Sequence, residues 1–196
     1  MIGQEADVYR QLKQYLSKYI TLSDEQLTLF CSKFKHRKTK RGEILLHAGE
    51  VAPYSYFVNS GCRRVYMMDA DGRESTRFLI FENCVGTAFP SFTLQEPSMA
   101  YIQSVEPSEI LYITHKDFNG LLDTFPGWER IYRIDLEREY IASIRRIESL
   151  ITMDAKQKYN MLMNTNPSLI QRLPSKIIAD YLGISQETLS RLKSKK

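Results

Sequence analysis

The C-terminal segment 174–196 constrains the fold most, because it places a single glycine between two short helix-forming runs. It reads PSKIIADYLGISQETLSRLKSKK. Gly183 stands where the chain must turn sharply, and a residue without a Cβ atom adopts such a turn with the least strain. Ala179 lies four residues earlier and is small enough to let two helices cross closely. The spacing predicts a helix-turn-helix.

The side chains of this segment separate into an apolar set and a polar set. The apolar set is expected to hold the two helices together and consists of Ile178, Leu182, Ile184, Leu189 and Leu192. Ser185 is well placed as the N-cap of the second helix, because its hydroxyl can accept a hydrogen bond from the first turn. The polar set is expected to face outward and consists of Ser185, Gln186, Glu187, Ser190, Arg191 and Ser194.

These outward side chains suit base edges and phosphates, so the segment predicts binding in the major groove of DNA. Lys193 and, at the start of the first helix, Ser175 and Lys176 complete the predicted DNA contacts. An ordinary amphipathic helical hairpin at a domain end is the alternative. The register of the small, glycine and apolar residues favours DNA binding over that alternative.

The formal charge of +4 is unevenly distributed along the chain. Residues 154–196 hold eight Lys/Arg and three Asp/Glu, whereas residues 1–153 hold nineteen and twenty. A small basic tail on a nearly neutral body is what phosphate binding requires, although a merely solvated tail would show the same balance. A second basic cluster, Lys33–Arg41, is predicted to be a solvated helix end and turn.

The composition is that of a soluble globular protein, with 43% hydrophobic and 26% charged residues. No apolar run is long enough to span a membrane, and the mixed-charge N-terminus is not a secretory signal. The three cysteines Cys31, Cys62 and Cys84 are scattered, which argues against a disulfide framework or a metal site. We therefore expect a cytoplasmic protein with no cofactor and no membrane partner.

Residues 1 to about 28 are expected to be helical, with Ser23 and Gln26 at capping-box spacing. From about 30 to 118 the pattern changes to short strands separated by turns. Asn59-Ser60-Gly61 opens one strand, and Asp69-Ala70-Asp71-Gly72 is a hairpin signal before another. Residues 86–98 are expected to be irregular, and strands are expected again at 100–105 and 109–113. Such regularly spaced short strands predict an antiparallel sandwich or jelly roll.

A long helix is predicted from Pro126 to Ile151. Ile134, Ile141 and Glu148 are spaced by seven residues, as are Glu137, Ile144 and Ile151, and a second stripe consists of Leu136, Tyr140, Ile147 and Leu150. Two apolar stripes predict that the helix packs on its own β domain and on the same helix of a second subunit. A helix buried within one chain is the alternative. A further helix is expected at 154–166.

The order of these parts resembles the Crp/Fnr family of regulators. The resemblance covers nearly the whole chain and includes Gly42-Glu43-Ile44-Leu45, Gly49-Glu50, Phe57–Gly61, Asp71-Gly72-Arg73-Glu74 and, most specifically, Gly183–Arg191. It implies an α+β fold: an antiparallel cyclic nucleotide-binding-like β-roll (jelly roll) over 1–125, a dimerisation helix over 126–151 and an all-α helix-turn-helix domain over 152–196. It also implies a homodimer on a palindromic operator, with RNA polymerase as a further partner.

In this family the Glu and Arg of an S-x-E-T-x-x-R motif read base edges, and these roles fall here on Glu187 and Arg191. Gln186 stands where many members have Arg, so an altered site preference is expected. Many members also carry a β-hairpin wing before the helix-turn-helix, for which residues 164–173 leave little room.

The chain departs from the nucleotide-binding members in its β-roll. Their G-E-x-A segment corresponds to Val85–Ala88, where Thr87 replaces the Glu, and their R-[ST]-A segment corresponds to Pro97–Ala100, which has no Arg. Without that guanidinium a cyclic phosphate loses its main charge-assisted contact, so cyclic AMP is disfavoured. The pocket is expected to bind another small molecule or nothing, and its candidate residues are Thr87, Ala88, Ser98, Met99 and Arg77.

Neither an iron–sulfur cluster nor haem is expected, because the cysteines do not cluster and His36, His47 and His115 show no ligand spacing. A cupin-type metalloenzyme would need clustered histidines, and no catalytic triad or carboxylate pair stands out. The chain is thus not expected to be an enzyme. The stronger alternative to a DNA-binding regulator is a sensor or interaction module whose C-terminal domain docks protein.

Overall fold

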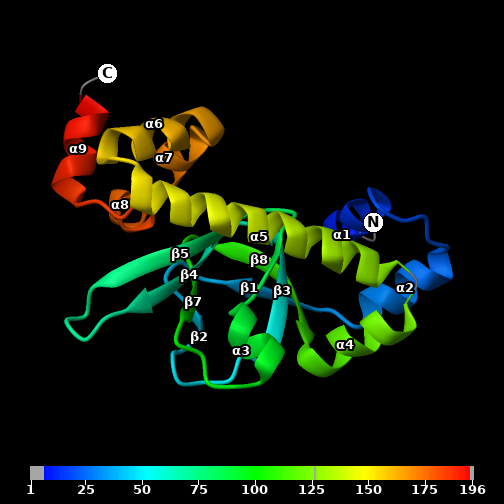
Figure 1. Cartoon of the computed structure of the whole chain (residues 1–196). Helices are drawn as coiled ribbons and strands as arrows, with labels where there is room; N and C mark the ends of the chain where they lie inside the picture. Colours follow the sequence, from blue (N-terminus) through cyan, green and yellow to red (C-terminus); the bar gives the residue numbers. More distant parts are fainter. Residues whose placement is uncertain (1–6, 126, 195–196) are drawn as a thin grey trace, which may run out of the picture. The chain divides into compact units, whose positions relative to one another are not determined.

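The computed structural model describes residues 7–125 and 127–194, and its strands form two four-stranded sheets that make a β-roll (Figure 1). The first sheet has the order β1-β8-β3-β6 and the second β2-β7-β4-β5. The first consists of β1 (Lys35–Thr39), β8 (Ser108–Thr114), β3 (Tyr54–Ser60) and β6 (Val85–Gly86), and the second of β2 (Ile44–Leu46), β7 (Tyr101–Ser104), β4 (Arg63–Met68) and β5 (Glu74–Ile80). The predicted α+β class with an N-terminal β-roll is confirmed.

One face of the first sheet is covered by helices. Phe57 of β3 and its cross-strand partner Leu111 of β8 are both completely buried on this face. Helix α1 (Arg10–Ser17) packs here, with the ring of Tyr15 centred 5.5 Å from that of Phe57. Because successive residues of a strand point to opposite faces, Tyr54, Tyr56 and Tyr112 lie on the other face, inside the roll.

An aromatic cluster joins α2 (Asp24–Ser32), α4 (His115–Thr124) and the first turn of α5 (Trp128–Thr152). The ring of Trp128 lies 5.0 Å from that of Phe30 and 5.5 Å from that of Phe118, both nearly edge-on. Edge-to-face pairs of this kind add to the free energy gained from burial alone. The cluster anchors the beginning of the long helix to α2 and α4.

The N-terminal prediction is confirmed in part: α1 and α2 are present, but residues 18–23 between them are not helical. Ser23 and Gln26 form the expected capping box, with Gln26 N donating to Ser23 Oγ at 3.2 Å and Ser23 N donating to Gln26 Oε1 at 2.9 Å. Helix α2 continues to Ser32, four residues beyond the expected end. Residues 1–6, also expected to be helical, lie outside the described residues.

The prediction of a helix end and turn at Lys33–Arg41 is wrong. Residues Lys35–Thr39 form β1, which pairs antiparallel with β8 and places His36 opposite Leu111. The strand carries cations on both faces, and only Thr39 is buried. Edge strands commonly carry such charges because they discourage pairing with other chains, and the charges remove the alternating pattern by which a strand is recognised.

The stretch 86–98, expected to be irregular, contains the short helix α3 (Phe89–Leu94). A proline stands in the first turn of this helix. The helix is capped at its C-terminal end by Gln95, whose φ of +55° is left-handed.

From Trp128 onward the described residues form helices joined by short connections, as predicted (Figure 1). Helix α5 ends at Thr152, one residue beyond the expected end, and its expected first residue, Pro126, lies outside the described residues. Four helices follow: α6 (Ala155–Thr165), α7 (Ser168–Arg172), α8 (Ser175–Leu182) and α9 (Gln186–Ser194). The end of α6 and the helix α7 occupy most of the stretch 164–173, so these described residues form no hairpin wing.

The chain divides into two compact units. One comprises residues 1–65 and 79–133, and the other comprises residues 66–78 and 134–196. The hairpin formed by β4 and β5 thus belongs for the most part to the same unit as the C-terminal helices. The three-part division predicted from the sequence stays a prediction. Among the described residues, no helix is both long and apolar enough to cross a membrane.

Candidate nucleic-acid interface

The core of the helix-turn-helix is built from the predicted apolar residues. Ile178 and Ala179 of α8 are each 1% exposed, and Leu189 of α9 is completely buried. Leu182 is also buried, whereas Ile184 and Leu192 are half-buried. This packing fixes the angle between α8 and α9 and leaves the opposite side of α9 free.

The turn between the two helices depends on Gly183. Its φ of +62° is left-handed, and the chain closes the turn with a hydrogen bond of 3.0 Å from Ile184 N to Ala179 O. A Cβ atom at this position would lie 3.2 Å from Leu150 Cδ2 of α5. Both the backbone conformation and the limited space therefore favour glycine here.

Ser185 caps α9 as predicted. Thr188 N donates to Ser185 Oγ at 3.1 Å, which satisfies one of the free N–H groups of the first turn. The other N–H groups at this end keep their partial positive charge, which favours phosphate.

The six residues expected to face outward are all exposed, and they are Ser185, Gln186, Glu187, Ser190, Arg191 and Ser194. Glu187 and Arg191 are four residues apart on one helix, so they lie on the same face. The pKa of Glu187 lies below its usual value. The largest cause is a hydrogen bond from its own backbone N–H, followed by a hydrogen bond from Ser185 and the nearby positive charge of Arg191. Glu187 is therefore an ionised hydrogen-bond acceptor at neutral pH, and it lies next to the guanidinium donor of Arg191.

Two predicted cationic contacts are already paired within the chain. Lys193 Nζ donates to Ser175 Oγ at 2.9 Å, which joins the end of α9 to the start of α8. Lys176 Nζ lies 3.4 Å from Glu74 Oε2 of the β4–β5 hairpin, in the same compact unit. A DNA phosphate would have to compete with Glu74 for Lys176, so Lys176 would contact DNA only where a phosphate displaces Glu74.

Helix α5 exposes an apolar surface along its C-terminal half. Its large exposed side chains are Tyr140, Ile141, Ile144, Ile147, Leu150 and Ile151, with exposed fractions from 39% to 77%. Tyr140, Ile144, Ile147 and Ile151 follow the alternating spacing of four and three residues that coiled coils use. Ile134 and Leu136, from the predicted stripes, are half-buried.

The candidate effector residues use their polar groups within the fold. Thr87 Oγ1 donates to Tyr54 O at 2.8 Å, and Ser98 Oγ donates to Ala100 O at 2.8 Å. Ala88 is buried at the start of α3, and Met99 is 83% exposed. Arg77 lies in β5 of the other compact unit, with its guanidinium 4.9 Å from the ring centre of Phe78.

One polar group inside the roll was missed by the sequence reasoning. The Arg63 side chain of β4 is completely buried, and none of its three guanidinium nitrogens has a hydrogen-bond partner among the described residues. The signal was the pair Arg63-Arg64 in an otherwise apolar strand. Because strand side chains alternate, one of two adjacent arginines must point into the roll.

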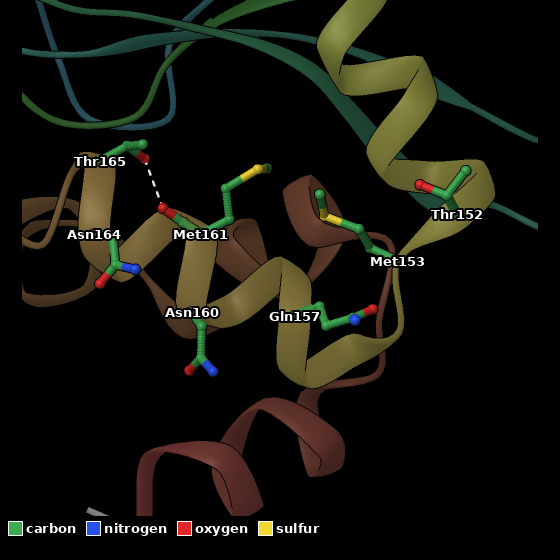
Figure 2. Close-up of a pocket in the computed structure, with 7 residues that line it drawn as sticks. All are labelled: Thr152, Met153, Gln157, Asn160, Met161, Asn164 and Thr165. Carbon is green, nitrogen blue, oxygen red and sulfur yellow. Dashed lines mark hydrogen bonds between the residues drawn. The ribbon is translucent and has the colours of Figure 1, made fainter.

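A hollow of about 600 Å³ lies between the end of α5 and α6, and Figure 2 shows its lining. The lining consists of Thr152, Met153, Gln157, Asn160, Met161, Asn164 and Thr165. It is open to solvent and contains amides and methionines but no charged group, so it offers no strong contact for DNA.

The architecture defines a class of protein that has a β-roll, a long helix and a C-terminal helix-turn-helix whose second helix, α9, exposes a polar face. Residues 36–125 match the family of the cyclic nucleotide-binding domain. Over 179 residues the chain is 25% identical to the cAMP-activated global transcriptional regulator CRP of Pasteurella multocida, a match that covers 86% of each chain.

Two solved structures have a similar fold. The c-di-GMP responsive global regulator CLP of Xanthomonas campestris has a TM-score of 0.71 at 17% identity, over 88% of this chain and 91% of that one. A putative Crp/Fnr transcriptional regulator from Eubacterium rectale has a TM-score of 0.67 at 18% identity, over 89% and 83%. The family match over residues 36–125 and the similarity to these regulators confirm the resemblance to the Crp/Fnr family that the sequence predicts.

Proposed function

We propose that the chain is a homodimeric, sequence-specific DNA-binding regulator of transcription. The observation that carries the proposal is the outer face of α9, where Glu187 and Arg191 lie side by side and free of the helix-turn-helix core. Arg can bond O6 and N7 of guanine together, and a carboxylate can accept from N4 of cytosine. Ser185, Gln186 and Ser190 complete the direct contacts.

The phosphate contacts come from the ends of the two helices. The capped N-terminus of α9 offers N–H groups to a phosphate. Ser175, Lys176 and Lys193 surround the start of α8, and the basic balance of residues 154–196 adds a general attraction. Helix α8 would cross the backbone while α9 enters the groove, as in other helix-turn-helix proteins.

Dimerisation is assigned to the exposed apolar surface of α5. A contiguous apolar surface on a helix favours association, and the spacing of Tyr140, Ile144, Ile147 and Ile151 fits a parallel pair of helices. Two α9 helices would then read half-sites about one helical turn apart, roughly 34 Å, on a nearly palindromic operator. Contact with RNA polymerase and a cytoplasmic location belong to the same proposal.

The β-roll is proposed to sense an effector other than cyclic AMP. The two hydroxyls nearest the nucleotide-binding segments, Thr87 Oγ1 and Ser98 Oγ, donate to backbone carbonyls, and the carboxylate and guanidinium of the nucleotide-binding members are absent from these segments. An effector would shift the equilibrium between two orientations of the α9 helices. It would do so by binding one of these two states more tightly than the other.

The proposal is tested by selecting bound sequences from a random duplex library at two salt concentrations. The expected result is an enriched inverted repeat whose affinity falls steeply with salt, because each neutralised phosphate releases counterions. Arg191→Ala is the matched variant and should lose enrichment at one position of each half-site. Salt-sensitive binding without any enrichment would contradict direct readout. Salt-independent capture of proteins and no DNA binding would favour the alternative module, in which the C-terminal domain docks protein.

A further inference from the structure

The buried guanidinium of Arg63 is a cation with no counter-ion in the part of the chain that the structure describes. Its side chain has no exposed surface, and its Nε, Nη1 and Nη2 atoms have no hydrogen-bond partner among the described residues. A charge removed from water and left unpaired is among the most costly arrangements in a protein interior. Native structures usually retain such a group only where something satisfies it.

Arg63 lies in the space between the two sheets. It belongs to β4 of the second sheet, yet its guanidinium carbon is 4.4 Å from the ring centre of Tyr56, which belongs to β3 of the first sheet. Tyr56 reaches in the opposite direction, with its Oη 3.5 Å from the carbonyl oxygen of Leu45 in β2. The two side chains therefore cross the interior of the roll.

Three tyrosines form a wall beside this cation. Tyr56 is opposite Tyr112 in the sheet register, and the ring of Tyr54 lies 6.2 Å from that of Tyr56 and 4.9 Å from that of Tyr112. Tyr54 and Tyr112 are half-exposed, whereas Tyr56 is buried. The wall thus begins at the surface and ends at Arg63.

Among the described residues, the groups that act electrostatically on Arg63 are the hydroxyl of Tyr56 and the thiol of Cys62, and neither is a carboxylate. Burial raises the pKa of Tyr56 to about 12, so its phenol stays neutral at physiological pH. Burial lowers the pKa of Arg63 to about 10, which still leaves the guanidinium charged at neutral pH. Arg37, a second cation that acts on Tyr56, is already paired with Glu43 at 2.6 Å.

We propose that the β-roll binds a small organic anion whose carboxylate or phosphate pairs with Arg63 and whose apolar part lies against Tyr54, Tyr56 and Tyr112. A guanidinium presents parallel N–H donors that match both oxyanions, and aromatic rings offer an apolar surface next to them. The proposed anion contact, Arg63, is not one of the residues of the nucleotide-binding segments, although Thr87 donates to the carbonyl oxygen of Tyr54 and Gly86 pairs with Tyr56.

This inference deepens the effector-sensing part of the proposed function, and it is tested without DNA. The midpoint of thermal unfolding of the full chain is measured in sodium benzoate and in sodium phosphate, each against sodium chloride at equal ionic strength. A ligand that binds only the folded state raises this midpoint with a saturable concentration dependence. We expect such a rise for at least one of the two anions, and the stronger anion identifies the oxyanion as carboxylate or phosphate.

Two variants make the test specific. Arg63→Met removes the unpaired cation at similar volume, so it should unfold at a higher midpoint than wild type in chloride and no longer respond to benzoate or phosphate. Arg41→Met, at an exposed arginine, should respond as wild type does. If Arg63→Met does not fold, Arg63→Lys keeps the charge but loses the parallel donors, and its half-saturating concentration should rise about tenfold.

The proposal is overturned if neither anion changes the wild-type midpoint, or if the Arg63 variant that folds responds as wild type does. Either result would leave selection of an inverted repeat from the DNA library unaffected. Conversely, a failed selection with an intact Arg63-dependent response would reject the DNA-binding function and keep the ligand site.

Discussion

Arg146 Nη2 donates a hydrogen bond of 2.9 Å to the carbonyl oxygen of Thr76. The same guanidinium lies 4.1 Å above the ring centre of Tyr181. Arg146 belongs to α5, Thr76 to β5 and Tyr181 to α8, all within the compact unit that contains the helix-turn-helix. One side chain thus ties the long helix, the hairpin and the first helix of the reader together.

Arg146→Met is expected to weaken the attachment of α8, the first helix of the helix-turn-helix, to α5 and β5. It removes a hydrogen bond from a charged donor and a cation–π contact, which together contribute about 1–2 kcal/mol at a partly exposed position. Hydrogen exchange should become faster in α8, and the free energy of unfolding should fall by that amount in a denaturant titration. Arg145→Met changes the exposed neighbour and should have neither effect. Equal exchange rates in the two variants would show that Arg146 does not hold α8.

Arg191→Ala is expected to weaken binding to the selected operator by about 1–3 kcal/mol and to relax preference at one base position per half-site. The reason is that Arg191 is exposed on the outer face of α9, where its guanidinium can reach a base edge. The measurement is a competition titration against operators changed at single positions. Arg41→Ala, which changes an exposed arginine of the other compact unit, is the control and should change affinity little. A uniform loss on every operator would assign Arg191 to phosphate contact.

The C-terminal reader could be predicted from the sequence because its determinants are local. Gly183 supplies a left-handed turn, Ser185 caps the next helix, and Leu189 follows at helical spacing from the cap, all within seven residues. The exposure of Glu187 and Arg191 follows from that spacing alone.

Other features could not be read from the sequence because they depend on distant partners. Strand β1 has cations on both faces and exists through its pairing with β8, some seventy residues further on. The burial of Arg63 depends on Tyr56 in the opposite sheet. The link from Arg146 to Thr76 likewise joins a helix to a strand that the pattern of either one alone does not indicate.

Ile144→Asp together with Ile147→Asp is expected to produce monomers. Both side chains are exposed, at 39% and 53%, so charges there should leave each chain folded while opposing a helix pair. Sedimentation equilibrium should give the mass of one 22.9 kDa chain instead of two, with an unchanged circular dichroism spectrum. Operator affinity should fall steeply, because a monomer engages one half-site.

The control for this pair is Arg145→Asp, which puts the same charge on the same helix away from the Tyr140–Ile151 stripe. It should sediment as wild type does. A double variant that remains a dimer would assign the interface to another surface and leave the apolar face of α5 without a role in assembly.

Cyclic AMP is expected not to bind the β-roll at millimolar concentration. The ribose and phosphate contacts of nucleotide-binding relatives fall on Thr87 and on the stretch Pro97–Ala100, where the hydroxyls of Thr87 and Ser98 already donate to carbonyl oxygens at 2.8 Å. Turning either hydroxyl toward a ligand would leave a backbone acceptor without its donor, a loss of about 1–3 kcal/mol. Isothermal titration of the full chain with cyclic AMP should give only heats of dilution, and benzoate or phosphate titrated into the same preparation checks that the roll is intact. Saturable binding of cyclic AMP that survives Arg63→Met would show that the segments around Thr87 and Ser98 hold a nucleotide without their usual carboxylate and guanidinium.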